Sequence, residues 1–310
     1  MKQLCIALGA FASFVVIVSA QNNPFEGRWD LTVTTPRDSY PDWMEVKQAD
    51  GKTTITVQPR TASTRIAADV KREGSHLMFT LIPATDRAPA TTWDLNIEGG
   101  KVVGTVRRGA DVLGQIAGVK APDLIRKMPA KWTTPEPIFN GKDLTGWEPM
   151  TPAASHWVVE NGELVNKEHG SNIKTTRKFD DFKLHIEYNC PESGNSGIYL
   201  RGRYEVQIEY EPEGTEDKFH TLGAIYSFVA PTVMLPRKPG QWETLDITLV
   251  GRRVTIVRNG VKTVDNQEIP GITGGAIDSN EGEPGPFYIQ GDHTGGMRYR
   301  NIRISVPKKG

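Results

Sequence analysis

Short runs in which apolar and polar side chains alternate follow one another along most of the chain, and long helical periodicity is scarce. In the second half, Asn161-Gly162 and Asn259-Gly260 lie between apolar runs, which is the strongest local signal for a hairpin turn. About a dozen strands are expected between Ile138 and Pro307. This pattern predicts an all-β fold whose second half is a two-sheet jelly-roll sandwich.

Residues 21–120 form a separate series of alternating runs. Turn signals at Asp50-Gly51, Glu73-Gly74 and Gly99-Gly100 predict a small antiparallel barrel or sandwich of about seven strands. No cluster of His, Cys or carboxylate side chains indicates chemistry here, so this domain is expected only to support or extend a binding surface. The runs are Arg28–Thr34, Trp43–Lys47, Thr53–Gln58, Ile66–Lys71, His76–Leu81, Thr92–Ile97 and Val102–Arg107.

Residues 121–137 form the best boundary in the chain. They contain four prolines, which disfavour both a continuing helix and a central strand. Because proline-rich connections are semi-rigid, the domain before this linker and the domain at residues 138–307 are expected to hold a preferred relative orientation.

Residues 1–20 have the layout of a secretory signal peptide. Lys2 supplies a positive start, Ile6–Val18 is almost uninterrupted apolar sequence, and small residues lead to Ala20. A membrane anchor is the alternative, but this run is shorter than the roughly 20 apolar residues that a span needs. We therefore expect cleavage near Ala20 and a secreted or periplasmic protein. Cys190 is then its only cysteine, so an intramolecular disulfide is impossible.

The charges balance, with 37 Lys and Arg against 37 Asp and Glu. A net charge of zero gives no electrostatic reason to expect nucleic acid or an anionic membrane as a partner. The oligomeric state is not indicated by the sequence.

The most distinctive stretch is SGNSGIYLRGRYEVQIEY, from Ser193 to Tyr210. In a strand alternate side chains face opposite ways, so Val206, Ile208 and Tyr210 are predicted to share a buried face. Glu205, Gln207 and Glu209 then form a polar row on the other face. Tyr199 and Arg201 share a face of the preceding run. A concave sheet carrying such a row is suited to binding a sugar and moving its protons.

Five motifs occur in order in the second half: Asn140-Gly141-Lys142-Asp143-Leu144 with Gly146-Trp147, Gly194–Tyr199, Glu205-Val206-Gln207, Asn259-Gly260-Val261, and Gln290–His293 with Tyr299–Ile302. Together they make residues 137–306 resemble the 3-keto-disaccharide hydrolase family. The resemblance implies a concanavalin A-like jelly roll with its site on the concave sheet. It also implies a carbohydrate substrate, a glycoside whose sugar is oxidised at C3.

Such a substrate allows cleavage by elimination. A base removes the acidic C2 proton, the enolate expels the leaving group at C1, and water adds back, so the net reaction is hydrolysis. The protein must supply a base of near-neutral pKa, a positive or hydrogen-donating group at the enolate oxygen, and an acid.

Several side chains are candidates for these roles. The candidate bases are Glu209, Glu205 and His220. Arg201 or a metal ion is expected to hold the enolate oxygen. His293 is a candidate acid, or a metal ligand beside Asp292. The sequence requires no cofactor. A divalent metal ion is kept as an alternative, although the chain has no Asp-rich loop with EF-hand spacing. The residues expected to contact substrate are Tyr199, Arg201, Gln207, Tyr226, Gln290, Asp292 and Arg300.

Two other functions stay open. A retaining glycosidase also carries carboxylates on one concave strand, about 5–5.5 Å apart. In this chain the middle position of the row Glu205, Gln207 and Glu209 is an amide, and this counts against a retaining glycosidase. A lectin-like module that binds glycan without turnover fits the fold equally well.

Overall fold

The computed structural model describes residues 23–83, 89–209 and 217–308. The expected signal peptide and Tyr210 lie outside these residues. The regular secondary structure of these residues is almost entirely β-strand, with one short 3₁₀ helix at Pro152–Ala154. The all-β prediction is confirmed. In this part of the chain, no helix is long and apolar enough to cross a membrane.

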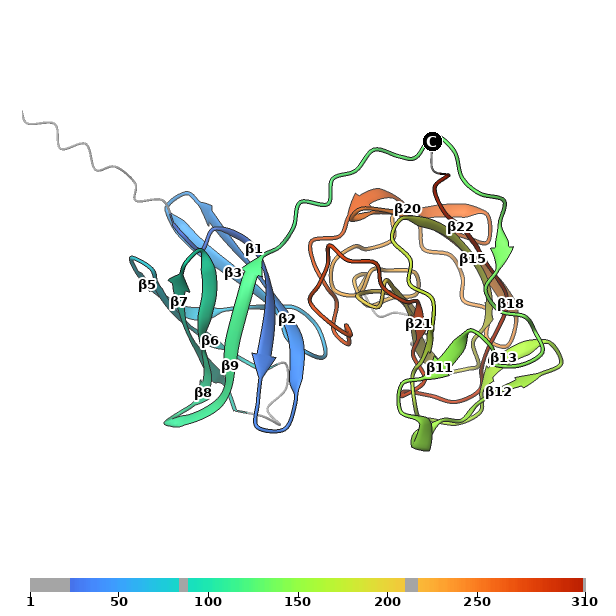
Figure 1. Ribbon diagram of the computed structural model, residues 1–310, viewed down its shortest axis with the longest axis horizontal. Coiled ribbons are helices and arrows are strands. Elements are labelled where there is room, and N and C mark those ends of the chain that lie inside the picture. Colours follow the sequence, from blue (N-terminus) through green and yellow to red (C-terminus); the bar gives the residue numbers. More distant parts are fainter. Residues whose placement is uncertain (1–22, 84–88, 210–216, 309–310) are drawn as a thin grey trace, which may run out of the picture.

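The N-terminal domain is one antiparallel sheet of nine strands (Figure 1). The strands are β1 (Gly27–Thr34), β2 (Ser39–Ala49), β3 (Lys52–Gln58), β4 (Arg65–Ile66), β5 (Ala68–Glu73), β6 (His76–Leu81), β7 (Thr91–Glu98), β8 (Lys101–Arg108) and β9 (Asp111–Lys120). They follow the order β4-β3-β2-β1-β9-β8-β7-β6-β5, and only Ala67 separates the two edge strands in sequence. The sheet therefore curls into a barrel around its own apolar core, which includes Trp29 and Leu31.

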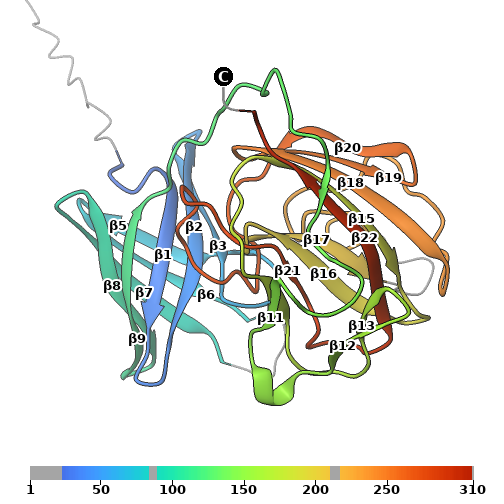
Figure 2. The same cartoon turned by 45° about the vertical axis from the view of Figure 1, so that its right-hand side comes forward.

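The C-terminal domain consists of two sheets that enclose the larger core. Its strands are β10 (Glu136–Pro137), β11 (Trp147–Pro149), β12 (Trp157–Glu160), β13 (Glu163–Asn166), β14 (Ile173–Thr175), β15 (Phe182–Asn189), β16 (Asn195–Leu200), β17 (Tyr204–Glu209), β18 (Trp242–Val250), β19 (Arg253–Arg258), β20 (Val261–Glu268), β21 (Tyr288–Ile289) and β22 (Met297–Ser305). One sheet has the order β12-β13-β22-β15-β18-β19-β20, with β10 beside β22. The other has the order β11-β14-β21-β16-β17, and its central strands lie side by side in Figure 2.

The β16–β17 hairpin positions the polar row. Its antiparallel register places Tyr199 opposite Glu205 and Gly197 opposite Gln207. Val206 and Ile208 are buried in the core, as the alternation predicted. At Gly197 an added Cβ would lie 2.2 Å from Oε1 of Glu205, so glycine makes room for that carboxyl group.

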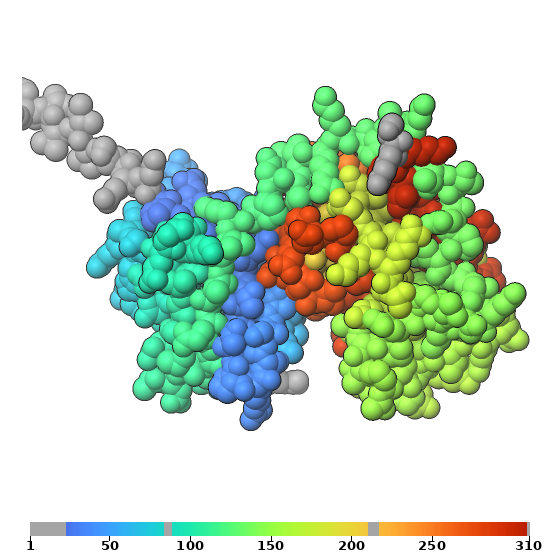
Figure 3. All heavy atoms as spheres, viewed as in Figure 1, coloured from blue at the N-terminus to red at the C-terminus, as the bar shows by residue number. Residues whose placement is uncertain are grey.

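The two domains are in direct contact. Trp43 of β2 is fully buried and belongs to the core cluster of the C-terminal domain. Gly271 of the C-terminal domain accommodates it, because an added Cβ would lie 2.3 Å from the indole ring. The connecting residues 121–135 hold no strand but bury Leu124, and β10 pairs with β22. Figure 3 shows the domains touching along their upper part, with a hollow below.

Candidate active site

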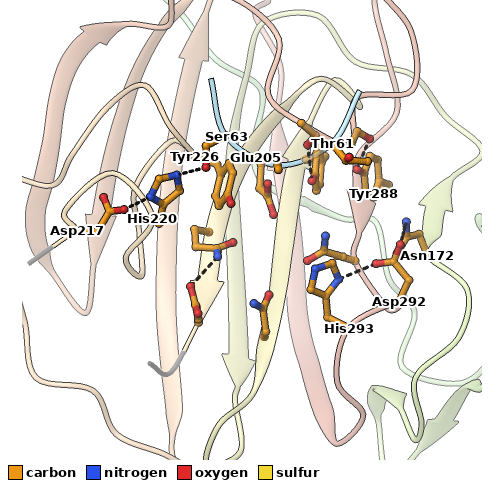
Figure 4. Close-up of a pocket in the computed structure, with 18 residues that line it drawn as sticks. Thr61, Ser63, Asn172, Glu205, Asp217, His220, Tyr226, Tyr288, Asp292 and His293 are labelled. Atoms are coloured by element: carbon orange, nitrogen blue, oxygen red, sulfur yellow. Dashed lines mark hydrogen bonds and ion pairs between the residues drawn. The ribbon is translucent and has the colours of Figure 1, made fainter. Parts of the chain in front are cut away.

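A polar pocket of about 550 Å³ lies on the β16–β17 sheet, and a loop of the N-terminal domain forms one wall (Figure 4). All the candidate residues except Arg201 and Arg300 line it. These are Tyr199, Glu205, Gln207, Glu209, His220, Tyr226, Gln290, Asp292 and His293. The structure thus brings together side chains from distant parts of the C-terminal domain. It also adds Thr61, Ala62 and Ser63, from the domain in which no chemistry was expected.

Arg201 is a core residue and not the expected contact to the enolate oxygen. Its φ of 52° places it in the turn that follows β16. The alternation of side chains between the two faces of the strand therefore ends before Arg201, and Arg201 does not share a face with Tyr199. The side chain is fully buried and donates to the carbonyl of Gly251 at 2.7 Å and to a carboxylate oxygen of Asp180 at 3.2 Å. It therefore does not reach the pocket.

Arg300 also lies away from the pocket, contrary to expectation. Its Nε donates to Glu187 at 2.6 Å, and its guanidinium lies 3.9 Å from the centre of the Trp242 ring. Both partners belong to the strands of the larger sheet, so Arg300 stabilises that sheet and does not contact a pocket ligand.

Glu205 is the most deeply buried carboxyl group of the pocket, with 4% of its surface exposed. Burial raises its pKa to about 8, a hydrogen bond with Tyr199 opposes the shift, and the charges of Asp292 and Glu209 add to it. At neutral pH this carboxyl group is therefore mostly protonated, and it can donate a hydrogen bond.

Two stacked tyrosines form another wall. The rings of Tyr199 and Tyr288 are 3.8 Å apart. Their hydroxyl groups donate to the carbonyls of Gly274 at 2.8 Å and Gly275 at 2.6 Å. At Gly275, where φ is +84°, an added Cβ would lie 2.5 Å from the Tyr199 oxygen. Tyr288 is the first residue of the two-residue strand β21, and sequence reasoning missed it because the apolar run around it is typical of core.

Two His–Asp pairs lie at opposite ends of the pocket (Figure 4). Nδ1 of His220 pairs with Asp217, and Nδ1 of His293 lies 3.0 Å from Asp292. Burial favours the neutral form of Asp292, but the hydrogen bond and charge of His293 outweigh it and lower the pKa of this carboxyl group. Each aspartate holds the proton on Nδ1, so Nε2 of each imidazole is left to exchange protons with other groups.

Ser63 of the N-terminal domain contacts one of these imidazoles. Its Oγ lies 2.7 Å from Nε2 of His220, while Oγ of Ser227 lies farther from the same nitrogen, at 3.2 Å. The loop that carries Ser63 is held by Gln58, whose amide donates to the carbonyls of Pro59 and Ala62 at 2.8 Å each. Small hydroxyl residues in a surface loop give no sequence signal of this contact.

A metal site is not assigned. Within residues 23–83, 89–209 and 217–308, no three His, Cys, Asp or Glu side chains converge in a group that could hold a metal ion.

The model of one protein family, described as the 3-keto-alpha-glucoside-1,2-lyase-like domain, matches residues 134–305, which is more than half of the chain. The chain belongs to this family. The resemblance expected for residues 137–306 is confirmed, and the 3-keto-alpha-glucoside-1,2-lyase-like domain coincides with the jelly roll and with most of the pocket. Membership places the chain among proteins that act on glycosides.

Solved structures similar to this chain include two candidate glycosyl hydrolases from Parabacteroides distasonis. The first is 29% identical with a TM-score of 0.48, covering 59% of this chain and 93% of that one. The second is 21% identical with a TM-score of 0.46, covering 57% and 94%. SCLam, an endo-beta-1,3(4)-glucanase of family GH16, is 12% identical with a TM-score of 0.38, covering 59% and 94%. No curated protein matches the chain.

Proposed function

We propose that the protein cleaves glycosides whose sugar carries a ketone at C3, by elimination across C1 and C2 followed by hydration. The observation that carries this proposal is the buried carboxyl group of Glu205 at a polar pocket. The family description, which names a 3-keto-alpha-glucoside 1,2-lyase, supports the same substrate class and the same bonds.

The reaction needs few groups. The base takes the C2 proton, and the electron pair of that bond forms a double bond between C2 and C3 while the ketone oxygen becomes an enolate. When the carbonyl forms again, a C1–C2 double bond forms and the C1–O bond breaks. The leaving oxygen takes a proton from the acid. Water then adds hydroxyl to C1 and hydrogen to C2, which gives the free 3-keto sugar.

Glu205 is assigned to the enolate oxygen. In its protonated form the carboxyl group donates a hydrogen bond, and that bond strengthens as negative charge develops on the oxygen. A carboxylic acid that burial keeps neutral near pH 7 stabilises an enolate in this way in other enzymes. This role replaces the one expected for Arg201, which is buried elsewhere.

Glu209 is assigned as the base. It follows Glu205 and Gln207 on the same face of β17, and Nε2 of Gln207 donates to its Oε2 at 2.9 Å. A donated amide hydrogen bond favours an ionised carboxylate, the form that accepts a proton. General bases of this kind contribute roughly a hundredfold or more to rate.

His220 is assigned as the acid for the leaving group, because it is the imidazole beside the N-terminal wall of the pocket. His293 and Asp292, at the other end, are assigned with Gln290 to the hydroxyl groups of the sugar. Asn172 supports this end, since its amide oxygen accepts from the backbone N–H of Gly291 at 2.7 Å.

The cellular setting is part of the same proposal. A 3-keto sugar forms by oxidation of the C3 hydroxyl group, so an oxidoreductase must act first. The signal-peptide pattern of residues 1–20 supports an exported protein that meets its oxidised substrate in the cell envelope or outside the cell.

The purified chain from residue 21 onward is the material for the test. It is incubated with a glucoside and with its 3-keto form, with and without EDTA, while release of the leaving group is followed. Only the keto form is expected to react, and deuterium at C2 should slow the reaction if removal of that proton limits the rate. Cleavage of the unoxidised glucoside would instead indicate a glycosidase, and glycan binding without turnover would indicate a lectin.

A further inference from the structure

A second cavity of about 290 Å³ opens in the N-terminal barrel, outside the region that the family model matches. Its walls include the rings of Tyr40 and Trp93 and the aliphatic side chains of Leu81, Val106 and Leu113. Trp93 also stacks on Phe79, with centroids 5.5 Å apart, which fixes its ring. A cavity of about 150 Å³ is enough to hold benzene, so this one accommodates a substituted aromatic ring.

A buried carboxyl group faces this cavity. Asp42 is 3% exposed, and its Oδ1 has no hydrogen-bond partner among the described residues. Burial raises the pKa of Asp42 well above its usual range, although a hydrogen bond from the backbone N–H of Arg60 opposes the shift. Only Oδ1 of this carboxyl group is without a partner, and a buried polar atom in that state is costly, so a hydroxyl group of a ligand would satisfy it.

The cavity adjoins the catalytic pocket. Thr61 lines both spaces. The carbonyl of the neighbouring Arg60 accepts from the backbone N–H of Gly275, which belongs to the wall of the catalytic pocket, at 2.8 Å. The two spaces are therefore separated by one short loop that is attached to both domains.

We propose that the barrel cavity binds the leaving group of the substrate, and that this group is an aromatic ring bearing a hydroxyl group. The sugar lies in the polar pocket, the glycosidic bond lies near Thr61, and the hydroxyl group of the leaving group bonds to Asp42. This assignment rests on the proposed function. It gives the N-terminal domain a role in substrate selection.

Binding is tested without turnover. Phenol is titrated into the full chain labelled with ¹⁵N, and the indole N–H signals are followed, with Trp93→Phe used to assign Trp93. Phenol should shift the Trp93 signal. Leu113→Trp fills the cavity and should weaken phenol binding at least about tenfold. Val112→Trp is the matched control, because Val112 is 45% exposed and does not line the cavity, and it should bind phenol like the parent chain.

A second variant keeps the test decisive if Leu113→Trp does not fold. Asp42→Leu removes the carboxyl group and is expected to fold, because loss of the unpaired buried Oδ1 offsets loss of the acceptor for the backbone N–H of Arg60. It should lose the preference for phenol over benzene. An unshifted Trp93 signal in the parent chain would overturn the proposal, as would a shift produced by glucose but not by phenol.

Kinetics then separate this inference from the proposed function. 4-Hydroxyphenyl and methyl 3-keto-glucosides are compared by their kcat/KM values, because the 4-hydroxyphenyl group keeps a free hydroxyl group for Asp42 when its other oxygen forms the glycosidic bond. Leu113→Trp should lower kcat/KM about tenfold for the 4-hydroxyphenyl substrate and leave kcat/KM for the methyl substrate unchanged. If neither substrate is cleaved while phenol still binds beside Trp93, the proposed reaction fails and the binding site stands. Equal effects on both substrates would overturn the site as a leaving-group site.

Discussion

The indole ring of Trp43 and the phenyl ring of Phe228 meet edge to face across the domain boundary, with centroids 5.5 Å apart. Trp43 comes from β2, yet it is fully buried in the C-terminal core. Trp43→Ala should therefore destabilise the whole protein by about 3–5 kcal/mol, the usual cost of deleting a buried aromatic ring. Urea denaturation of the parent protein and of Trp43→Ala measures this difference in the free energy of unfolding. A loss below about 1 kcal/mol would show that the domains do not depend on this contact.

Glu205→Gln should retain most activity, because the amide still donates a hydrogen bond. Glu205→Ala removes the donor and should cost about a hundredfold or more in kcat. The wild-type rate should fall as pH rises through about 8, where the donor proton is lost, and Glu205→Gln should lack this decline. The pH profile of kcat for the three proteins is the measurement. A wild-type rate that rises through the same pH range would make Glu205 a base instead.

Glu209→Gln should cost at least about a hundredfold in kcat if Glu209 removes the C2 proton. The amide keeps the size of the side chain, so KM and the thermal midpoint should change little. Exchange of the C2 hydrogen with deuterated solvent gives a direct second readout and should slow in parallel. Near-normal turnover in the folded variant would remove Glu209 from the role of base.

Ser63→Ala should lower kcat by up to about tenfold, because it removes a hydrogen bond worth about 1 kcal/mol that orients His220. Thr64→Ala is the matched control, since it deletes a hydroxyl group one position away and keeps the backbone N–H that donates to Ser227 at 3.4 Å. Long-range ¹H–¹⁵N spectra of the histidine side chains report the tautomer. Equal rates and equal histidine spectra for the two variants would show that Ser63 does not position His220.

Asp30 gives a prediction about stability. It is buried at the domain boundary, and burial, followed by the charge of Glu281, raises its pKa to about 9 from its usual value of 3.8. A raised folded-state pKa favours folding at low pH, so this contribution should be lost as pH rises from about 4 to about 9. In Asp30→Asn, the free energy of unfolding should change less with pH over this range. Urea unfolding across that range tests it, and an unchanged slope would contradict the assignment.

The polar row of β17 was predictable because a strand has a fixed period of two, and the burial of Val206 leaves Glu205 no other side to face. The same rule failed at Arg201, because the chain leaves the strand there and a positive φ turns the side chain into the core. The period of two predicts which way a side chain faces only while the strand continues. The sequence RGRY does not mark the end of strand β16 unambiguously.

The N-terminal wall of the pocket could not be predicted. Thr61 and Ser63 lie in the connection between β3 and β4, and their only distinction is the surface that they meet in another domain. Strand β9 was also missed, because Gly114 and Gly118 interrupt its apolar pattern. Gly118 is needed there, since an added Cβ would lie 2.3 Å from the side chain of Leu31.

The hydrogen bond between Ser63 and His220 joins residues that are 157 positions apart in the chain. A substitution in either loop therefore changes the surroundings of a residue in the other. Among relatives with both domains, substitutions at these two positions should occur together. A relative that has only the jelly roll must satisfy its corresponding histidine by other means. The small barrel is thus in direct contact with the loop that carries His220, so a change in the barrel can alter the surroundings of this imidazole.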